Sequence, residues 1–395
     1  MDSRAELEAR QLTQLRELLG GVTASNRFYQ AKLGAIEGLD GMASLSDYAA
    51  MVPLTTKAEL VRDQQAHPPY GSNLTFPVEA YTRFHQTSGT TGQPLRWLDT
   101  PRSWDALVEG WVEVFEAAGV HAGDRVLFAF TFGPFIGFWM AFEAATRLGC
   151  LCLPGGGLTS AARLRMILDN AVTVLCCTPT YAARLAEVAA EENLSLAGAG
   201  VRLLVVAGEP GGSIPGVRSR LERLWCGARV FDHHGMTEVG PVTYECPARP
   251  GVLHVIESGY VPEVIDPRTG KASAAGEAGE LVLTTLRRLG SPLLRYRTGD
   301  LVRARPGGEG PCVCGRVELA LEGGILGRVD DMLIIRGVNV FPGAVDEIIR
   351  GLPEIAEYQV RIETVHHLDE LKVLIEPVPG CTEVSDLVGR LRTAM

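Results

Sequence analysis

The sequence has few cysteines, no excess of basic residues and no uninterrupted apolar run of membrane length. Nine cysteines in 395 residues are too sparse for a disulfide-stabilised scaffold, and their odd number argues against complete pairing. The 47 acidic residues outnumber the 37 basic ones, and the net charge of −10 excludes a general attraction to nucleic acid or to an anionic membrane. The one membrane-like run, 126–142, is broken by two glycines and a proline.

The N-terminus, Met1–Leu7, is charged where a secretory signal would have an apolar core. We therefore expect a cytoplasmic protein whose partners include neither nucleic acid nor a membrane. With 46% hydrophobic and 21% charged residues, the composition is that of a globular chain, and its length predicts two or three domains.

The first two thirds of the chain alternate between helical patterns and short buried strands. Leucines at helical spacing between Leu7 and Leu19 predict an amphipathic N-terminal helix. Charge-free runs rich in β-branched residues predict strands of a parallel sheet at 126–130, 172–177 and 203–207. Helical patterns lie beside or between them at 104–118, 134–148 and 161–170. The predicted fold class is α/β, with parallel sheets flanked by helices.

Beyond about residue 240 the pattern changes to strands punctuated by turns, which predicts a small β-rich subdomain over 240–327. A Gly-containing basic joint then precedes a helical pattern at 343–350 and alternating strands at 358–363 and 371–376. We therefore predict a large domain over 1–327 and a small α+β domain over 328–395.

A loop rich in hydroxyl groups and glycine runs from Gln86 to Pro94. Glycine lets backbone N–H groups close around an anion, and Ser and Thr donate further hydrogen bonds to phosphate oxygens. The loop lacks the Lys-Ser/Thr ending of a Walker loop and precedes a strand. It predicts a phosphate-binding loop, although a flexible turn would have the same composition.

Three further turns carry groups suited to a nucleotide. Ala207–Gly212 follows a predicted strand with small residues that admit a flat ring or a ribose. Asp232–Glu238 offers a hydroxyl and a carboxylate for a phosphate and its Mg²⁺. The segment Arg295–Asp300 ends in a carboxylate that could accept hydrogen bonds from both hydroxyls of a ribose. Each turn taken alone also fits an ordinary turn or salt bridge.

Together and in this order, the segments resemble the adenylate-forming superfamily of acyl- and aryl-CoA ligases, in particular its phenylacetate-CoA ligase-like branch. The matching segments are 53–57, 87–92, 235–238, 296–300 and the long motif 327–342. The resemblance covers about residues 50 to 376. It implies ATP-dependent activation of a carboxylic acid as acyl-AMP, with release of pyrophosphate, followed by transfer to CoA.

The resemblance also implies roles for individual residues. Thr237 would touch the α-phosphate, Glu238 would hold Mg²⁺, and Arg328 would lie close by as a third catalytic residue. Asp330 matches the hinge about which the small domain rotates between half-reactions. The residues expected to bind ATP are Thr87, Ser88, Gly89, Thr90, Thr91, Gly92, Gly208, Glu209, Pro210, Asp232, His233, His234, Gly235, Met236 and Asp300.

The segment after the first buried strand lines the acid pocket in this family. Its counterparts here are Phe132, Gly133, Phe135, Ile136, Phe138 and Trp139. Aromatic walls with small residues suit a flat aromatic acid, although aromatic residues at this spacing also fit a plain core.

The sequence departs from the family at three places. His234 stands where the family usually has Tyr or Phe beside adenine, and Arg96 only approximates a Lys that many members carry after the phosphate loop. Family members also carry a catalytic Lys near the C-terminus, whereas no Lys follows Lys372 here. The small domain is thus expected to stop short of that residue. Either adenylation proceeds without it or a terminal piece is absent from the sequence.

A metal site is predicted from Cys246, His254, Cys312 and Cys314. Three thiols and one imidazole can close a tetrahedral Zn²⁺ site, and some related sequences show a similar set. Such a zinc would be structural, and free thiols are the alternative. The remaining cysteines in apolar strands fit buried core residues better.

Two other functions fit the same sequence. One keeps the adenylation and passes the acyl group to the phosphopantetheine of a carrier protein or to an amine. The other, suggested by the missing Lys, is a nucleotide-binding pseudoenzyme or scaffold. The sequence also leaves a homodimer open.

Overall fold

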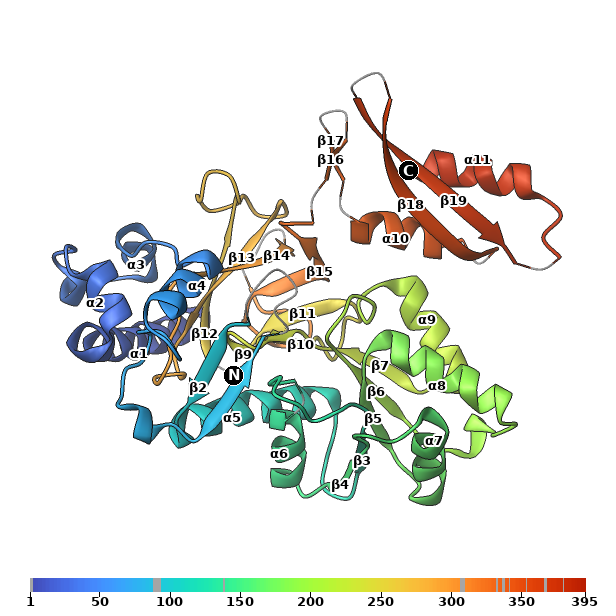
Figure 1. The fold of residues 1–395 in the computed structure, drawn as a ribbon, viewed down its shortest axis with the longest axis horizontal. Coiled ribbons are helices and arrows are strands. Elements are labelled where there is room, and N and C mark those ends of the chain that lie inside the picture. Colours follow the sequence, from blue (N-terminus) through green and yellow to red (C-terminus); the bar gives the residue numbers. More distant parts are fainter. Residues whose placement is uncertain are drawn as a thin grey trace.

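The computed structural model shows a large body and a smaller domain beside it (Figure 1). The described residues are 3–87, 94–137, 139–305, 310–331, 333–335, 338–340, 342–352, 354–365, 368–378 and 380–395. Within them, we find no helix with the length and apolar character needed to cross a membrane.

A five-stranded parallel sheet forms one half of the body, with strand order β4-β3-β5-β6-β7. Its strands are β3 (Arg125–Phe128), β4 (Leu151–Pro154), β5 (Val174–Cys177), β6 (Leu203–Val206) and β7 (Arg229–Asp232). Successive residues face opposite sides, so Leu127 and Leu175 join one hydrophobic cluster and Phe128 and Cys176 join another. Apart from Arg125, Arg229 and Asp232 at strand ends, the strand residues are apolar, because both faces of the sheet are covered.

Helices cover both faces of this sheet (Figure 1). On one face lie α7 (Ser160–Asp169), α8 (Pro179–Glu191) and α9 (Pro215–Leu224); on the other lie α5 (Pro101–Ala118) and α6 (Trp139–Arg147). The predicted helix at 134–148 was wrong at its start. Pro134–Gly137 lie outside any helix, because the N–H of Gln86 donates to the Pro134 carbonyl and Gly137 has a φ of +28°.

An antiparallel sheet forms the second half, with strand order β10-β11-β15-β14-β13-β12. The strands are β10 (Thr243–Glu245), β11 (Val252–Val255), β12 (Tyr260–Ile265), β13 (Ala278–Thr285), β14 (Tyr296–Ala304) and β15 (Ala320–Arg328). The short strands β8 (Gly235–Met236) and β9 (Gly240–Pro241) form a hairpin between the two sheets. The α/β class predicted from the sequence is confirmed.

The N-terminal segment packs against the antiparallel sheet. It contains α1 (Arg4–Ser25), α2 (Arg27–Leu33), α3 (Leu45–Met51), α4 (Lys57–Ala66) and the hairpin strands β1 (Arg83–Gln86) and β2 (Arg96–Asp99), with short 3-10 helices at Leu39–Gly41 and Val78–Ala80. A third short 3-10 helix, Leu196–Gly198, lies between α8 and β6. The fully buried carboxylate of Glu257 accepts from Arg4 (2.7 Å) and Gln11 (2.9 Å) of α1 and from the Leu319 N–H (2.6 Å). These bonds fix α1 to the sheet.

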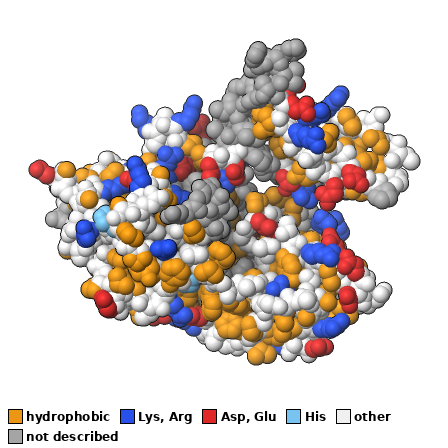
Figure 2. Space-filling model, viewed as in Figure 1, with side chains coloured by type: hydrophobic (Ala, Val, Ile, Leu, Met, Phe, Trp, Pro, Cys, Tyr) orange, Lys and Arg blue, Asp and Glu red, His pale blue; other side chains and the backbone are white. Residues whose placement is uncertain are grey.

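The small domain holds the last elements, β16 (Leu333–Ile335), β17 (Val338–Val340), α10 (Pro342–Arg350), β18 (Ile355–Val365), β19 (Leu368–Pro377) and α11 (Val384–Ala394). Strands β18 and β19 form a long antiparallel hairpin, and its core includes Val345, Ile349 and Leu391 from the two helices. Helix α10 approaches α9 of the body. The space-filling view shows the two lobes with a notch between them (Figure 2).

Candidate active site

The predicted nucleotide segments meet where neighbouring parallel strands end. Ala207–Gly212 follows β6, and Asp232, the last residue of β7, opens the segment that reaches Glu238. Because β6 and β7 are adjacent and parallel, their carboxyl ends lie at one edge of the sheet, where α/β folds bind ligands.

Asp232 is held in place by its neighbours at this edge. Its carboxylate accepts from the Ser213 hydroxyl at 2.5 Å, and burial raises the pKa of the Asp232 carboxyl above its ordinary value. A Cβ on Gly212 would lie 2.5 Å from the Asp232 carboxyl carbon, so only glycine fits there. Gly208 has a φ of +94°, which also favours glycine.

The Glu209 side chain turns away from this turn toward α8. Its carboxylate accepts from the Thr180 N–H at 2.6 Å, at the start of that helix, where a negative charge is stabilising. Pro210 follows it directly and is exposed.

The two adjacent histidines have different surroundings. His233 is buried against Trp111, with ring centroids 4.2 Å apart, and its Nδ1 lies 2.6 Å from the Thr243 carbonyl oxygen. Burial lowers the pKa of His233 to about 3, so the ring is neutral and Nδ1–H donates to that carbonyl. His234 is partly exposed, and its Nε2 lies 3.0 Å from Oδ2 of Asp300.

Asp300 is the centre of a charged cluster that includes the predicted hinge. Arg328 donates through Nη1 to Asp300 (3.0 Å) and to the Thr298 carbonyl (2.9 Å), and through Nε to Asp330 (3.0 Å). Burial would raise the pKa of the Asp300 carboxyl, but His234 and Arg328 outweigh it and hold that pKa below its ordinary value. Asp300 is therefore ionised near neutral pH.

Thr237 and Glu238 occupy the turn of the β8–β9 hairpin. Gly235 and Met236 form β8, and a Cβ on Gly235 would lie 2.8 Å from the Gly240 carbonyl oxygen. The Glu238 side chain is largely buried and lies 3.3 Å from Nζ of Lys57.

Lys57 is a site residue to which the sequence analysis gave no role, although it lies in the matching segment 53–57. It opens α4, and Thr55, two positions before it, is joined to Arg295 and Arg297 by backbone hydrogen bonds of 2.9 Å. The sequence motif was the available signal, but it did not reveal that Lys57 faces Glu238.

The predicted phosphate loop is closed at its base. The Thr87 N–H donates to the Leu95 carbonyl (2.9 Å), and the Leu95 N–H donates to the Thr87 hydroxyl (3.0 Å). These two bonds hold the ends of the loop side by side. The predicted residues between them, Ser88, Gly89, Thr90, Thr91 and Gly92, lie outside the described residues.

The predicted acid-pocket segment forms an aromatic cluster with one exposed member. Phe132 packs against Trp139 at 4.8 Å between ring centroids, and the Trp139 indole donates to the Gly133 carbonyl at 3.0 Å. Ile136 is buried, whereas Phe135 is 48% exposed. Phe138 lies outside the described residues.

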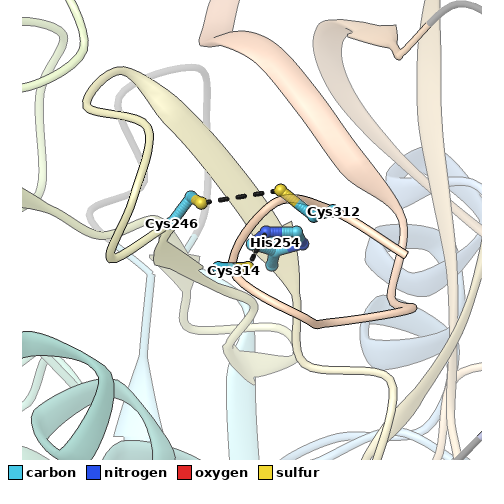
Figure 3. Close-up of side chains that lie close together, drawn as sticks. All are labelled: Cys246, His254, Cys312 and Cys314. Atoms are coloured by element: carbon cyan, nitrogen blue, oxygen red, sulfur yellow. Dashed lines mark hydrogen bonds between the residues drawn. The ribbon is translucent and has the colours of Figure 1, made fainter.

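The four predicted metal ligands converge at one end of the antiparallel sheet (Figure 3). Cys246 follows β10, His254 lies on β11, and Cys312 and Cys314 come from the turn between β14 and β15. The Cys246 and Cys312 sulfurs are 3.7 Å apart, and the Cys314 sulfur is 3.4 Å from Nε2 of His254. Zn–S bonds of about 2.3 Å at tetrahedral angles place two sulfurs about 3.8 Å apart, so the set fits zinc.

The surroundings of the cluster orient the ligands. The ring nitrogen Nδ1 of His254 lies 3.4 Å from the Glu318 carbonyl oxygen, which leaves Nε2 free for a metal. Burial raises the pKa of the Cys246 thiol to about 12. Burial would also raise the pKa of the Cys312 thiol, but the Cys314 N–H and neighbouring thiols outweigh it and lower that pKa.

Two family models match the chain: "AMP-binding enzyme" over residues 84–286 and "AMP-binding enzyme C-terminal domain" over residues 337–394. Phenylacetate-coenzyme A ligase of Thermus thermophilus is 34% identical over 378 residues, covering 94% of this chain and 82% of the relative. The ligase of the same name from Escherichia coli gives the same identity and coverage.

Among solved structures, 2-hydroxyisobutyryl-CoA ligase in the postadenylation state, in complex with 2-HIB-AMP, matches with a TM-score of 0.90. The identity is 28%, and the match covers 99% of this chain and 84% of that one. In complex with 2-HIB-AMP and CoA in the thioesterification state, that ligase matches with a TM-score of 0.79, 29% identity and coverage of 99% and 85%.

Proposed function

Because the chain belongs to the AMP-binding enzyme family, and within it to the phenylacetate-CoA ligase-like branch, we propose that it is an AMP-forming acid–thiol ligase. It activates a carboxylic acid with ATP as acyl-AMP, releases pyrophosphate, and passes the acyl group to CoA. The observation that carries this proposal is the meeting of Asp300, His234 and Arg328 beside the Thr237–Glu238 turn at the edge of the parallel sheet.

The proposed contacts follow the geometry at this edge. Asp300 is ionised and contacts His234 and Arg328. Its carboxylate could also accept hydrogen bonds from the hydroxyls of a ribose. The turn at Gly208–Pro210, with Asp232, frames adenine, while the loop from Thr87 to Gly92 and Thr237 hold phosphates. The Glu209 carboxylate would not contact adenine itself, because it is bound to the start of α8. It would instead hold the turn in place.

Glu238 is the proposed Mg²⁺ ligand, since its carboxylate oxygen is of the type that Mg²⁺ prefers; the ion would take the place of the Lys57 ammonium group, 3.3 Å away. When bound, Mg²⁺ would neutralise charge developing on the phosphate oxygens. Lys57, now 3.3 Å from Glu238, offers a second cation to those oxygens.

We propose an aromatic acid as substrate, from the relatives' printed activity and from the aromatic cluster around Phe132 and Trp139. A flat ring stacks favourably on such side chains. We also propose a large domain to residue 327 and a small domain from 328, rotating about Asp330, whose carboxylate is bound to Arg328.

A structural zinc bound by Cys246, His254, Cys312 and Cys314 completes the proposal, because the donor distances fit a tetrahedral ion. Its place between strands of the antiparallel sheet supports a role in folding and none in the reaction. A cytoplasmic location stays a prediction that agrees with the nine free cysteines.

The test is acid-dependent pyrophosphate release by the intact protein with a panel of aryl and alkyl acids, with and without CoA. Release with aryl acids and CoA-dependent turnover are expected. Release without CoA turnover would instead point to a carrier protein or an amine as acceptor. No release across the panel would defeat the ligase proposal in favour of a nucleotide-binding scaffold. Sedimentation of the same sample would show whether a homodimer forms.

A further inference from the structure

Three consecutive carbonyl groups in the turn between β8 and β9 are bound by buried side chains. Arg288 donates through Nη1 to the carbonyl oxygens of Thr237 (2.9 Å) and Glu238 (2.7 Å). The Tyr260 hydroxyl donates to the carbonyl oxygen of Val239 at 2.7 Å. We refer to Arg288 and Tyr260 as the carbonyl clamp.

Arg288 is itself held rigidly. Its Nε and Nη2 donate to the two carboxylate oxygens of Asp99, each at 2.7 Å, and its guanidinium lies 5.2 Å from the centre of the Trp97 ring. Arg288 is 1% exposed and Asp99 is fully buried. A bidentate pair of this kind fixes both the position and the plane of the guanidinium.

Asp99 connects the clamp to the phosphate loop. It is the last residue of β2, the strand that begins directly after Leu95, whose backbone closes the base of that loop. Arg288 therefore lies between the strand that follows the phosphate loop and the turn that carries Glu238.

The clamp determines how the turn presents its groups. In a planar trans peptide the C=O and N–H point in opposite directions. With the Thr237 and Glu238 carbonyls directed at Arg288, the N–H groups of Glu238 and Val239 point to the other side of the turn. The direction of the Cα–Cβ bond of Glu238, from which its side chain starts, is fixed at the same time, because its Cα joins the two peptide planes.

We propose that Arg288 and Tyr260 are positioning residues that hold Glu238 in the orientation needed to bind Mg²⁺, acting through the backbone carbonyls of the turn. This inference rests on the proposed function, since it assigns the metal to Glu238.

The test compares Tyr260→Phe and Arg288→Lys with Arg287→Lys. Tyr260→Phe keeps the ring and removes one hydroxyl, and Arg288→Lys keeps the charge but has three N–H donors, too few for the four hydrogen bonds that Arg288 makes. Arg287 is the matched control, because it is the adjacent arginine and its Nη1 lies 3.4 Å from Glu109 of α5.

Acid-dependent exchange of pyrophosphate into ATP is measured over a range of Mg²⁺ concentrations. The Mg²⁺ concentration giving half-maximal exchange is expected to rise about fivefold in either clamp variant, the effect of losing one hydrogen bond, with the rate at saturating Mg²⁺ within about twofold of wild type. Arg287→Lys should match wild type. Hydrogen exchange of peptides covering 235–241 should quicken in both clamp variants.

Two outcomes overturn the inference alone. In an active wild-type enzyme, an unchanged Mg²⁺ dependence in Tyr260→Phe would do so. A loss of rate that is equal at every Mg²⁺ concentration, with a lowered melting temperature, would indicate a purely structural role. Absence of exchange in the wild-type protein would instead overturn the proposed function, and the inference would fall with it.

Discussion

At the scale of single residues, the carboxylates proposed to bind ribose and Mg²⁺ are each paired with a cationic side chain. Asp300 lies between His234 and Arg328, and Glu238 lies beside Lys57. A ligand that binds either carboxylate displaces its cationic partner and must supply a new negative group for it. Phosphate oxygens are suited to this role.

Glu238→Gln removes the charge from the proposed Mg²⁺ ligand while keeping the shape of the side chain. We expect Mg²⁺-dependent pyrophosphate release to fall by about 100-fold or more, because phosphate charge in the transition state loses its metal. The measurement is initial rate against Mg²⁺ concentration, with the melting temperature as the folding control. Unchanged activity would refute the metal role.

His85 provides a pH prediction. It is stacked on Trp104 with 5.1 Å between ring centroids, and burial lowers the pKa of His85 to about 4. The unfolded chain therefore binds the proton more strongly between about pH 4 and 6.5, and stability falls as the pH drops through this window.

Replacing His85 with Phe keeps the stack and removes the titration. We expect the loss of unfolding free energy between pH 7 and pH 5 to shrink by about 2 kcal/mol. Urea unfolding at the two pH values checks this, and equal losses in variant and wild type would contradict it. His233, whose pKa is also lowered by burial, remains in both proteins.

Residue types within motifs could be predicted from the sequence, but their partners could not. His233 and Glu209 are predicted nucleotide-binding residues, but the sequence does not reveal that the His233 ring binds the Thr243 carbonyl or that the Glu209 carboxylate binds the start of α8. Lys57 reaches Glu238 across 181 positions of the chain. Such contacts depend on the packing of distant elements, which local spacing does not determine.

At the scale of elements, the long periodic and strongly apolar segments were predicted well. The N-terminal helix and the strands β3, β5 and β6 lie where the pattern placed them, within a few residues. The helix predicted at 134–148 begins only at Trp139. There a tertiary hydrogen bond from Gln86 to Pro134 overrides an apolar spacing that resembled a helix.

The turn between β14 and β15 gives a metal prediction. Cys312→Ser removes a thiolate ligand, so we expect zinc well below one per chain and a lower melting temperature, since metal binding contributes to folding. Metal analysis of protein purified without a His tag, before and after a chelator, checks both. Cys226→Ser, which alters an exposed thiol outside the cluster, is the control. A wild-type protein without zinc would refute the site.

At the scale of the whole molecule, the structure is more similar to one reaction state of 2-hydroxyisobutyryl-CoA ligase than to another. The match is closer to the postadenylation state than to the thioesterification state. The sequence predicted a joint near residue 327 from its glycine and charged residues. It could not predict the placement of the small domain, which depends on contacts such as that of α10 with α9.

Asp330→Pro tests movement about this joint. Proline fixes φ, so we expect acyl-AMP formation in a single turnover to persist within about threefold while transfer to CoA falls by about tenfold or more. Quenched-flow detection of both products measures the two steps separately. Asp330→Ala removes the contact with Arg328 without fixing the backbone, and it should transfer to CoA faster than the proline variant. Equal effects on both steps would argue against a hinge.

The anchoring of α1 has a consequence for studies that shorten the protein from its N-terminus. Trimming past Gln11 would do more than expose leucines, because it would remove two donors from the Glu257 carboxylate, which is fully buried in the intact chain. A charge stranded in this way destabilises its surroundings far beyond the point of truncation. Its third donor, the Leu319 N–H, immediately precedes β15, so damage from such a deletion would reach the strand that leads to Arg328.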